Sequence, residues 1–151
     1  MKILYLCPDL GIPVLGYKGA SIHVRELTAA LGRAGHQLVL AAQMLNKSAW
    51  ERPAQISIPI IQVRPGSATS SAVTSFKSFN QGIAVENSFP GELRRILYNQ
   101  DILDELRRRF ENNPPDFVYE RASLYGTAGV SLSQALGVPL FLELNAPLAL
   151  E

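Results

Sequence analysis

Short apolar runs alternate with amphipathic segments along this chain, as in a protein built from buried strands and covering helices. Residues 3–7 form a continuous apolar run, which predicts a strand buried on both faces, as in a parallel sheet. Between residues 20 and 34, apolar positions recur in steps of three and four, which predicts a helix that ends at Gly35. Residues 37–42 form a second apolar run. The first third of the chain therefore predicts a β-α-β unit with a right-handed crossover.

The remaining chain continues this alternation, with one segment that is hard to interpret. Residues 56–63 predict a third strand, and Pro59 inside it indicates a sheet edge or a bulge. The Ser- and Thr-rich residues 65–87 predict a loop with one short helix. The later pattern predicts a helix at 90–112, a strand at 116–119, a helix at 124–136 capped by Ser123, and a strand at 139–144. We therefore predict one Rossmann-like α/β domain over residues 1–151, a parallel sheet with helices on both faces.

Composition agrees with a folded domain and excludes several classes of protein. With 47% hydrophobic and 18% charged residues, the chain is unlike a disordered protein. A formal net charge of +1 gives no basic surface for nucleic acid. The single cysteine, Cys7, excludes an intrachain disulfide and a cysteine zinc site, and it favours a reducing, cytoplasmic location. No apolar window approaches the roughly 18 residues of a membrane span.

The loop after the first strand is the first place to search for chemistry, because ligands of open α/β sheets bind at the carboxyl ends of strands. Its glycines let the backbone approach a ligand, and the helix that follows directs free N–H groups and a positive dipole end at the same space. Either the loop binds an anion or its glycines serve only the turn. The pattern alone leaves both interpretations open.

Three known phosphate motifs are absent from this loop. A P-loop needs adjacent Gly and Lys followed by Ser or Thr, whereas residues 16–19 read Gly-Tyr-Lys-Gly. A dinucleotide fingerprint needs another glycine spacing and an acidic residue roughly 20 positions later, and the second strand ends at Ala42-Gln43. A receiver domain would need paired acids where Asp9 stands alone. No Asp-x-Asp pair or His cluster indicates a metal, and we expect no cofactor.

Three segments of the chain form a recognisable series. They are Gly16-Tyr17-Lys18-Gly19-Ala20-Ser21-Ile22-His23-Val24-Arg25-Glu26-Leu27 through Leu31 to Gly35-His36, then Asp116-Phe117-Val118-Tyr119-Glu120-Arg121, then residues 137–147. The first segment has a glycine loop, a helix with a Leu-x-x-x-Leu core and a Gly-His pair. In this order, the three segments resemble the retaining glycosyltransferases of family 4. The resemblance implies the N-terminal half of a GT-B fold, whose C-terminal donor-binding domain is absent from these 151 residues. It implies transfer of a sugar from a nucleotide-sugar to an acceptor hydroxyl with retention, and an inactive fragment.

The resemblance also implies the roles of individual residues. Donor phosphates would lie near the loop and the helix that follows it, at Gly16, Lys18, Gly19, Ala20, Ser21 and His23. The acceptor and the sugar would be oriented by Glu120, Arg121, Glu143 and Asn145. Asn145 stands where many members have a histidine. Strand alternation independently places Glu143 and Asn145 on one side of the last strand. The resemblance implies that the acceptor would be a glycan, a lipid or a small molecule.

Other interpretations of the same residues stay open. His23 faces either the cleft or the sheet, His36 is more simply a turn residue, and Glu120 and Arg121 can pair with each other. The arginines of residues 90–112 are most simply a solvated helix face, while peripheral membrane contact through this helix is an alternative. The chain could also be a free-standing binding module for a small anion or a protein partner, and a nicotinamide oxidoreductase is a more distant option.

Overall fold

The computed structural model describes residues 1–46 and 52–145. It contains β1 (Lys2–Cys7), α1 (Gly19–Arg33), β2 (Gln37–Ala42), β3 (Ile60–Gln62), α2 (Ser67–Gly82), α3 (Phe89–Phe110), β4 (Phe117–Arg121), α4 (Ala128–Leu136) and β5 (Leu140–Glu143). The segment around Trp50, for which the sequence indicated a loop without clear chemistry, lies mostly outside the described residues.

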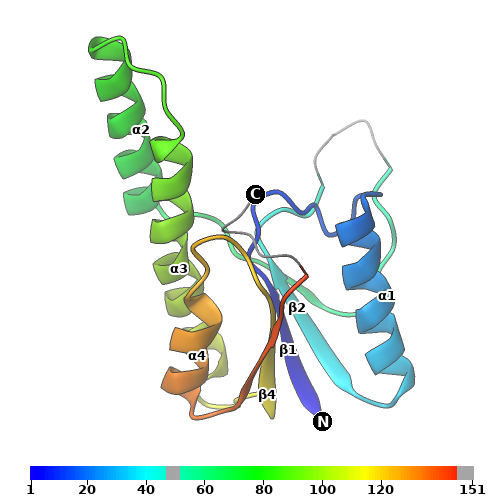
Figure 1. Cartoon of the computed structure of the whole chain (residues 1–151). Coiled ribbons are helices and arrows are strands. Elements are labelled where there is room, and N and C mark those ends of the chain that lie inside the picture. The colour runs from blue at the N-terminus through cyan, green and yellow to red at the C-terminus, as the bar shows by residue number, and fades with distance from the viewer. Residues whose placement is uncertain (47–51, 146–151) are drawn as a thin grey trace.

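The strands form one parallel sheet in the order β3-β2-β1-β4-β5. Helix α1 covers one face of the sheet, and α3 and α4 cover the other, with α2 packed on α3 (Figure 1). The predicted Rossmann-like arrangement with helices on both faces is confirmed. The strand order reverses between β1 and β4, so the loops after these two strands diverge and leave a crevice at the carboxyl edge.

Side-chain alternation along β1 divides the core into two halves. Leu4 and Leu6 pack toward α3 and α4, while Tyr5 and Cys7 pack toward α1. All four side chains are at most 1% exposed, because the strand lies at the centre of the sheet and is covered on both faces. Cys7 is a free, buried thiol, and burial raises its pKa to about 12.

Two element predictions were wrong. Residues 67–82 form a helix of 16 residues, α2, where a loop with a short helix was expected. Helix α4 begins at Ala128 and not near residue 124, so Ser123 is not its cap. Instead, Asn99 of α3 places its Oδ1 atom 2.8 Å from the Thr127 amide and 3.0 Å from the Ala128 amide. The third strand is shorter than predicted, but it lies at the sheet edge that Pro59 indicated. Gly35 and Gly137 follow their helices with positive φ angles, as expected.

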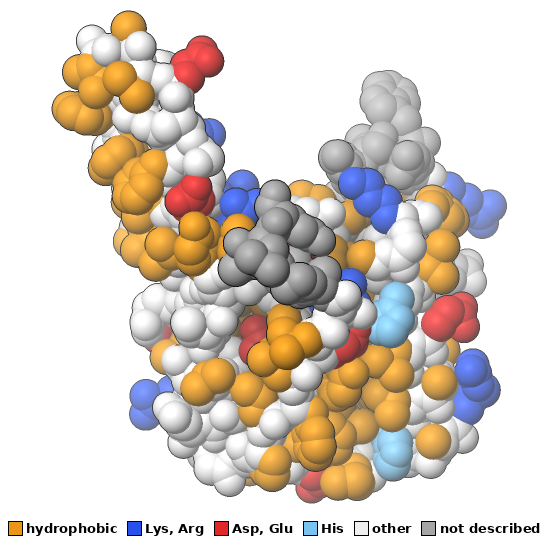
Figure 2. All heavy atoms as spheres, viewed as in Figure 1, with side chains coloured by type: hydrophobic (Ala, Val, Ile, Leu, Met, Phe, Trp, Pro, Cys, Tyr) orange, Lys and Arg blue, Asp and Glu red, His pale blue; other side chains and the backbone are white. Residues whose placement is uncertain are grey.

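The outer surfaces of α2 and α3 differ from one end to the other. Glu105 pairs with Arg108 and Arg109, as predicted for a solvated helix face. Figure 2 shows apolar side chains over the end where α2 finishes and α3 begins. Phe76, Phe79 and Phe89 are exposed there, and the Phe76 ring contacts the rings of the other two. No helix in the described ranges is both long and apolar enough to cross a bilayer.

Candidate functional site

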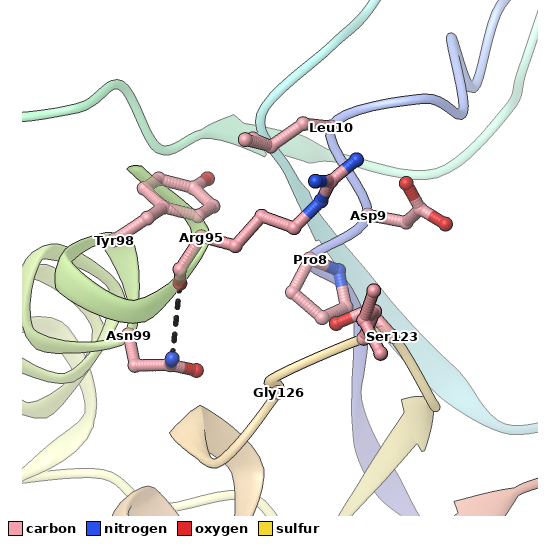
Figure 3. Close-up of a pocket in the computed structure, with 9 residues that line it drawn as sticks. Pro8, Asp9, Leu10, Arg95, Tyr98, Asn99, Ser123 and Gly126 are labelled. Atoms are coloured by element: carbon pink, nitrogen blue, oxygen red, sulfur yellow. Dashed lines mark hydrogen bonds between the residues drawn. The ribbon is translucent and has the colours of Figure 1, made fainter. Parts of the chain in front are cut away.

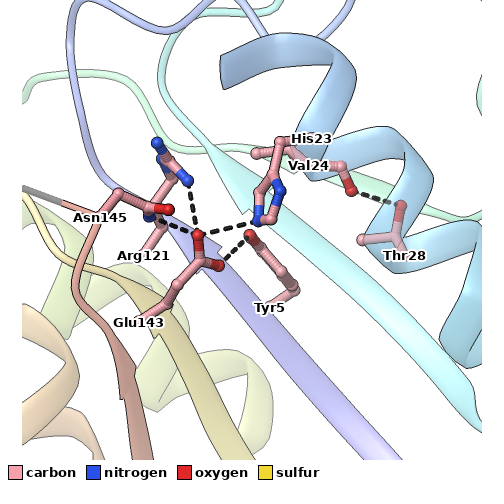
Figure 4. Close-up of polar contacts among 7 residues, drawn as sticks. All are labelled: Tyr5, His23, Val24, Thr28, Arg121, Glu143 and Asn145. Carbon is pink, nitrogen blue, oxygen red and sulfur yellow. Dashed lines mark hydrogen bonds and ion pairs between the residues drawn. The ribbon is translucent and has the colours of Figure 1, made fainter. Parts of the chain in front are cut away.

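Four side chains converge on the carboxylate of Glu143 at the carboxyl edge of the sheet. Its Oε1 atom lies 2.6 Å from Nη1 of Arg121 and 2.8 Å from Nε2 of His23, and it also accepts a hydrogen bond from Nδ2 of Asn145. Its Oε2 atom accepts a hydrogen bond of 3.2 Å from the Tyr5 hydroxyl. The four partners come from α1, β1, β4 and the segment that follows β5 (Figure 4). We call these five residues the Glu143 cluster.

Parallel strands and side-chain alternation explain why this cluster forms. In the register of the sheet, Arg121 of β4 lies opposite Glu143 of β5, and both face α1. Asn145 follows two positions later on the same side, as the alternation predicted. His23 reaches the cluster from the beginning of α1, so the open question about its direction is settled in favour of the cleft.

The electrostatics of the cluster keep Glu143 ionised. Burial alone would raise the pKa of the Glu143 carboxyl, but the hydrogen bonds from Asn145 and His23 and the charges of His23 and Arg121 outweigh it. Its pKa is therefore held below the usual range. Glu143 and Arg121 side chains are only 12% and 13% exposed, so the pair is fixed in position and is little screened by solvent.

Tyr5 belongs to this site, although the sequence gave no reason to separate it from the apolar strand around it. Its ring stacks on Tyr119 with centroids 5.1 Å apart, and its hydroxyl reaches Glu143. Burial, with the nearby Glu143 charge, raises the pKa of the Tyr5 hydroxyl, which is therefore protonated and donates to the carboxylate.

Replacing Glu143 by glutamine should destabilise the protein, because the change leaves the Arg121 guanidinium without its counter-charge. We expect the E143Q variant to lose about 2 kcal/mol in the free energy of unfolding at neutral pH. Urea denaturation measures this loss. In an R121Q background the same change should have less than half that effect. Equal losses in both backgrounds would show that the ion pair does not hold the cluster together.

The glycine loop lies beside the cluster, and its shape depends on Gly16 and Arg25. A side chain at position 16 would come within 2.9 Å of the Pro13 ring, so only glycine fits this turn without movement. Nη1 of Arg25 donates to the carbonyl oxygens of Val14 and Gly16, at 2.9 and 2.5 Å. The loop is therefore held rigidly at the start of α1.

The N-terminus of α1 is open to a ligand. The N-cap residue Lys18 makes no capping hydrogen bond through its side chain, and the first turn has no acidic residue. Within the described chain, nothing would lie within 4 Å of a Cβ atom at Gly19. Ala20 and Ser21 complete the turn, and the buried Ser21 hydroxyl has no hydrogen-bond partner among the described residues. This loop and the carboxyl ends of β4 and β5 therefore lie at one edge of the sheet.

Glu120 does not join the cluster, so the structure separates it from Arg121, Glu143 and Asn145, with which the resemblance grouped it. Neighbouring residues of a strand face opposite sides, so Glu120 faces α4 while Arg121 faces α1. Glu120 is 1% exposed, and neither carboxyl oxygen has a well-formed hydrogen bond with the described residues. Burial raises its pKa to about 7, which the nearby Gly129 amide offsets only in part.

A second hollow lies at the same edge of the sheet, on the side of α3. This pocket has a volume of about 230 Å³ and is lined by the loop after β1, the loop after β4 and one face of α3 (Figure 3). Its lining residues are Pro8, Asp9, Leu10, Arg95, Tyr98, Asn99, Ser123, Leu124 and Gly126. Asp9 and Ser123 could have been found from their places after strands, whereas Arg95 and Asn99 carry no such signal.

No group of three or more His, Cys, Asp or Glu side chains within residues 1–46 and 52–145 is placed to hold a metal ion.

Comparison with known proteins shows the fold of this chain. No family model matches the sequence, and no curated protein does. Two crystal structures of the C-terminal domain of a hydrogenase from Pyrococcus furiosus are similar in structure. The first is 15% identical with a TM-score of 0.51 over 95% of this chain and 90% of that chain. The second is 14% identical with a TM-score of 0.50 over 94% and 90%. At such identities the likeness extends to the fold alone, and the chain is a Rossmann-like α/β domain.

Proposed function

We propose that this chain is the acceptor-side domain of a retaining glycosyltransferase of the GT-B type. The observation that carries the proposal is the placement of an uncapped helix N-terminus and a rigid glycine loop beside the Glu143 cluster. The resemblance to family 4 glycosyltransferases, in the segments that form both features, supports it. The nucleotide part of the donor would be bound mainly by a second domain facing this edge. We place the protein in the cytoplasm, where the free Cys7 thiol stays reduced.

The glycine loop with the α1 N-terminus and the Glu143 cluster would have different roles in the reaction. In the transfer, the bond between the anomeric carbon and the donor diphosphate breaks, and the acceptor hydroxyl oxygen bonds to the same face of that carbon. The proton of that hydroxyl passes to the leaving diphosphate. The diphosphate gains negative charge as it leaves. Free N–H groups at Gly19, Ala20 and Ser21, together with the Lys18 ammonium, are suited to stabilise that charge without a metal.

The Glu143 cluster would orient the reacting sugar. Asn145 and His23 are held by Glu143 at the entrance of the crevice, and His23 is 45% exposed. Each can present further hydrogen-bonding groups to sugar hydroxyls while Glu143 fixes its direction. Glu143 and Arg121 are then positioning residues, and Asn145 and His23 are the groups that would touch the ligand.

A titration followed by NMR tests this proposal on the 151-residue chain. We expect UDP-glucose or GDP-mannose at about 10 mM to shift the amide signals of residues 16–21 and of Arg121, with a dissociation constant of about 1 mM. Binding should be weak because this domain would contact only the phosphates and the sugar. The K18Q variant should bind about fivefold more weakly, and K77Q on α2 should bind like the unchanged protein.

Two results would contradict the proposal. Absence of shifts at residues 16–21 would remove the donor from this edge. Micromolar binding would show that this domain binds the nucleotide itself. That result would contradict the proposal that a second domain binds most of the nucleotide. If inorganic phosphate binds as well as the nucleotide-sugars, the chain is better described as a binding module for small anions, which the open α1 N-terminus also allows.

A further inference from the structure

We infer that the pocket between α3 and the ends of β1 and β4 is the acceptor subsite, and that it takes a small polyol with one anionic group. This inference rests on the proposed function, because it names the acceptor of that reaction. The pocket opens at the point where the sheet reverses its strand order, which is where open α/β sheets bind ligands. It lies across the sheet edge from the open end of α1.

The size of the pocket limits the ligand. A volume of about 230 Å³ equals the space of roughly eight water molecules, so it suits a short polyol or a single sugar ring. Apolar walls are formed by the Tyr98 ring and by the side chains of Leu10 and Leu124. Such walls, with a few polar groups between them, are typical of sites for small polar molecules.

Two polar residues of the pocket are already committed to the fold. The Tyr98 hydroxyl donates to the Val63 carbonyl oxygen over 2.7 Å. The Asn99 side chain caps α4 through Oδ1, and its Nδ2 atom donates to the carbonyl oxygen of Tyr125 over 2.9 Å. These two side chains form the rigid rear of the pocket and leave recognition to the other polar groups.

Arg95 is the group that would recognise an anion. Figure 3 shows its side chain extending from α3 across the pocket toward Asp9 and Leu10. Within the described residues, the Arg95 guanidinium forms neither an ion pair nor a hydrogen bond. A guanidinium that lines a pocket with all its donors free is suited to a carboxylate or a phosphate, which it can bind through two hydrogen bonds.

The opposite wall of the pocket would recognise hydroxyl groups. Asp9 uses its Oδ1 atom to accept a hydrogen bond of 2.6 Å from the Gly11 amide, which leaves Oδ2 for a ligand hydroxyl. The Ser123 hydroxyl also lines this wall and has no hydrogen-bond partner in the described part of the chain. Because Asp9 would repel an anion, the charged group of the ligand would point to Arg95 and its hydroxyls to Asp9 and Ser123.

NMR titration of the 151-residue chain with four probes tests this inference. The probes are sn-glycerol 3-phosphate, D-glycerate, glycerol and inorganic phosphate. We expect at least one of the two anionic polyols to shift the amides of Asp9, Leu10, Ser123 and Gly126, and to bind about tenfold more tightly than glycerol or phosphate. The preferred anionic polyol tells whether the acceptor carries a phosphate or a carboxylate.

Matched variants assign the effect to Arg95. The R95Q variant should bind the anionic polyol about tenfold more weakly, while R94Q, one residue earlier on α3 and outside the pocket, should bind it as the unchanged protein does. The D9N variant keeps the acceptor for the Gly11 amide and should lose affinity for both polyols and glycerol alike.

Several outcomes would overturn the inference. Glycerol or inorganic phosphate could bind as tightly as the anionic polyols. R94Q could lose as much affinity as R95Q, or the shifts could be confined to residues 16–21. Each of these can occur while nucleotide-sugars still shift residues 16–21, in which case the proposed function stands and only the acceptor assignment fails. Failure of the nucleotide-sugars with success here would instead leave a small-molecule site without the transferase.

Discussion

The G129A variant is expected to lose about 3 kcal/mol in the free energy of unfolding, although glycine to alanine stabilises most helices. Gly129 lies in the first turn of α4, directly over the carboxyl group of Glu120. An added Cβ atom would lie 2.9 Å from the Glu120 Cδ atom and closer still to its Oε2 atom. Since Glu120 is 1% exposed, its carboxyl group cannot move aside into solvent.

Chemical denaturation of two further variants decides whether this contact is the cause. In an E120A background the obstructing carboxyl is gone, so adding G129A should be neutral or should stabilise α4 by up to about 1 kcal/mol. G32A in α1 is the matched control, because nothing lies within 4 Å of its Cβ position, and it should also be neutral or stabilising. If G129A destabilises equally with and without Glu120, the helix start and not the carboxyl is responsible.

The sequence was sufficient for most of the fold because each central strand carries its own signal. β1 and β2 are short apolar runs that are mostly buried, β4 opens with the apolar residues 117–119, and α1 and α3 repeat apolar residues at helical spacing. α2 was missed because its Ser- and Thr-rich sequence is typical of a loop, although its buried residues Thr69, Val73 and Asn80 recur at helical spacing. Packing against α3 favours the helix over the loop that its composition suggested.

The start of α4 was misplaced for a similar reason. Its first amides are bound by Asn99, which lies 28 residues before Thr127 in the chain. A local cap such as Ser123 can be found from the sequence, but a cap supplied by another helix cannot. The same hydrogen bonds from Asn99 hold α3 against α4, and the Asn99 side chain forms the rear of the pocket.

Strand alternation predicts which side chains of the candidate site lie on the same face of the sheet. Alternation placed Glu143 and Asn145 together, and they are in contact. The same rule places Glu120 and Arg121 on opposite faces of the sheet, so their separation could also have been predicted from the sequence. Tyr5 and Arg95 are different, because their roles depend on which side chains face them from distant segments.

Raising the pH through the range from about 4.5 to 7 should destabilise the protein through Glu120. Burial raises the pKa of this carboxyl from its ordinary 4.5 to about 7 in the folded state, so the folded protein holds a proton that the unfolded chain releases. The stabilisation is complete below pH 4.5 and is lost as the pH rises to about 7. The expected loss is about 3 kcal/mol, from 1.36 kcal/mol per pKa unit.

Urea denaturation of the unchanged protein and of E120Q, at several pH values between 4.5 and 8, measures this loss. The glutamine cannot ionise, so the free energy of unfolding of E120Q relative to the unchanged protein should rise by about 3 kcal/mol across the range. E86Q, at an exposed position, is the control and should track the unchanged protein at every pH. Glu105 and Glu143 have lowered pKa values and titrate below this range, so they do not produce the same slope. If the difference in stability between E120Q and the unchanged protein stays constant with pH, Glu120 ionises in the folded protein as readily as it does in the unfolded chain. The carboxyl beneath Gly126 and Gly129 would then have to be solvated, and the packing argued for G129A would fail with it.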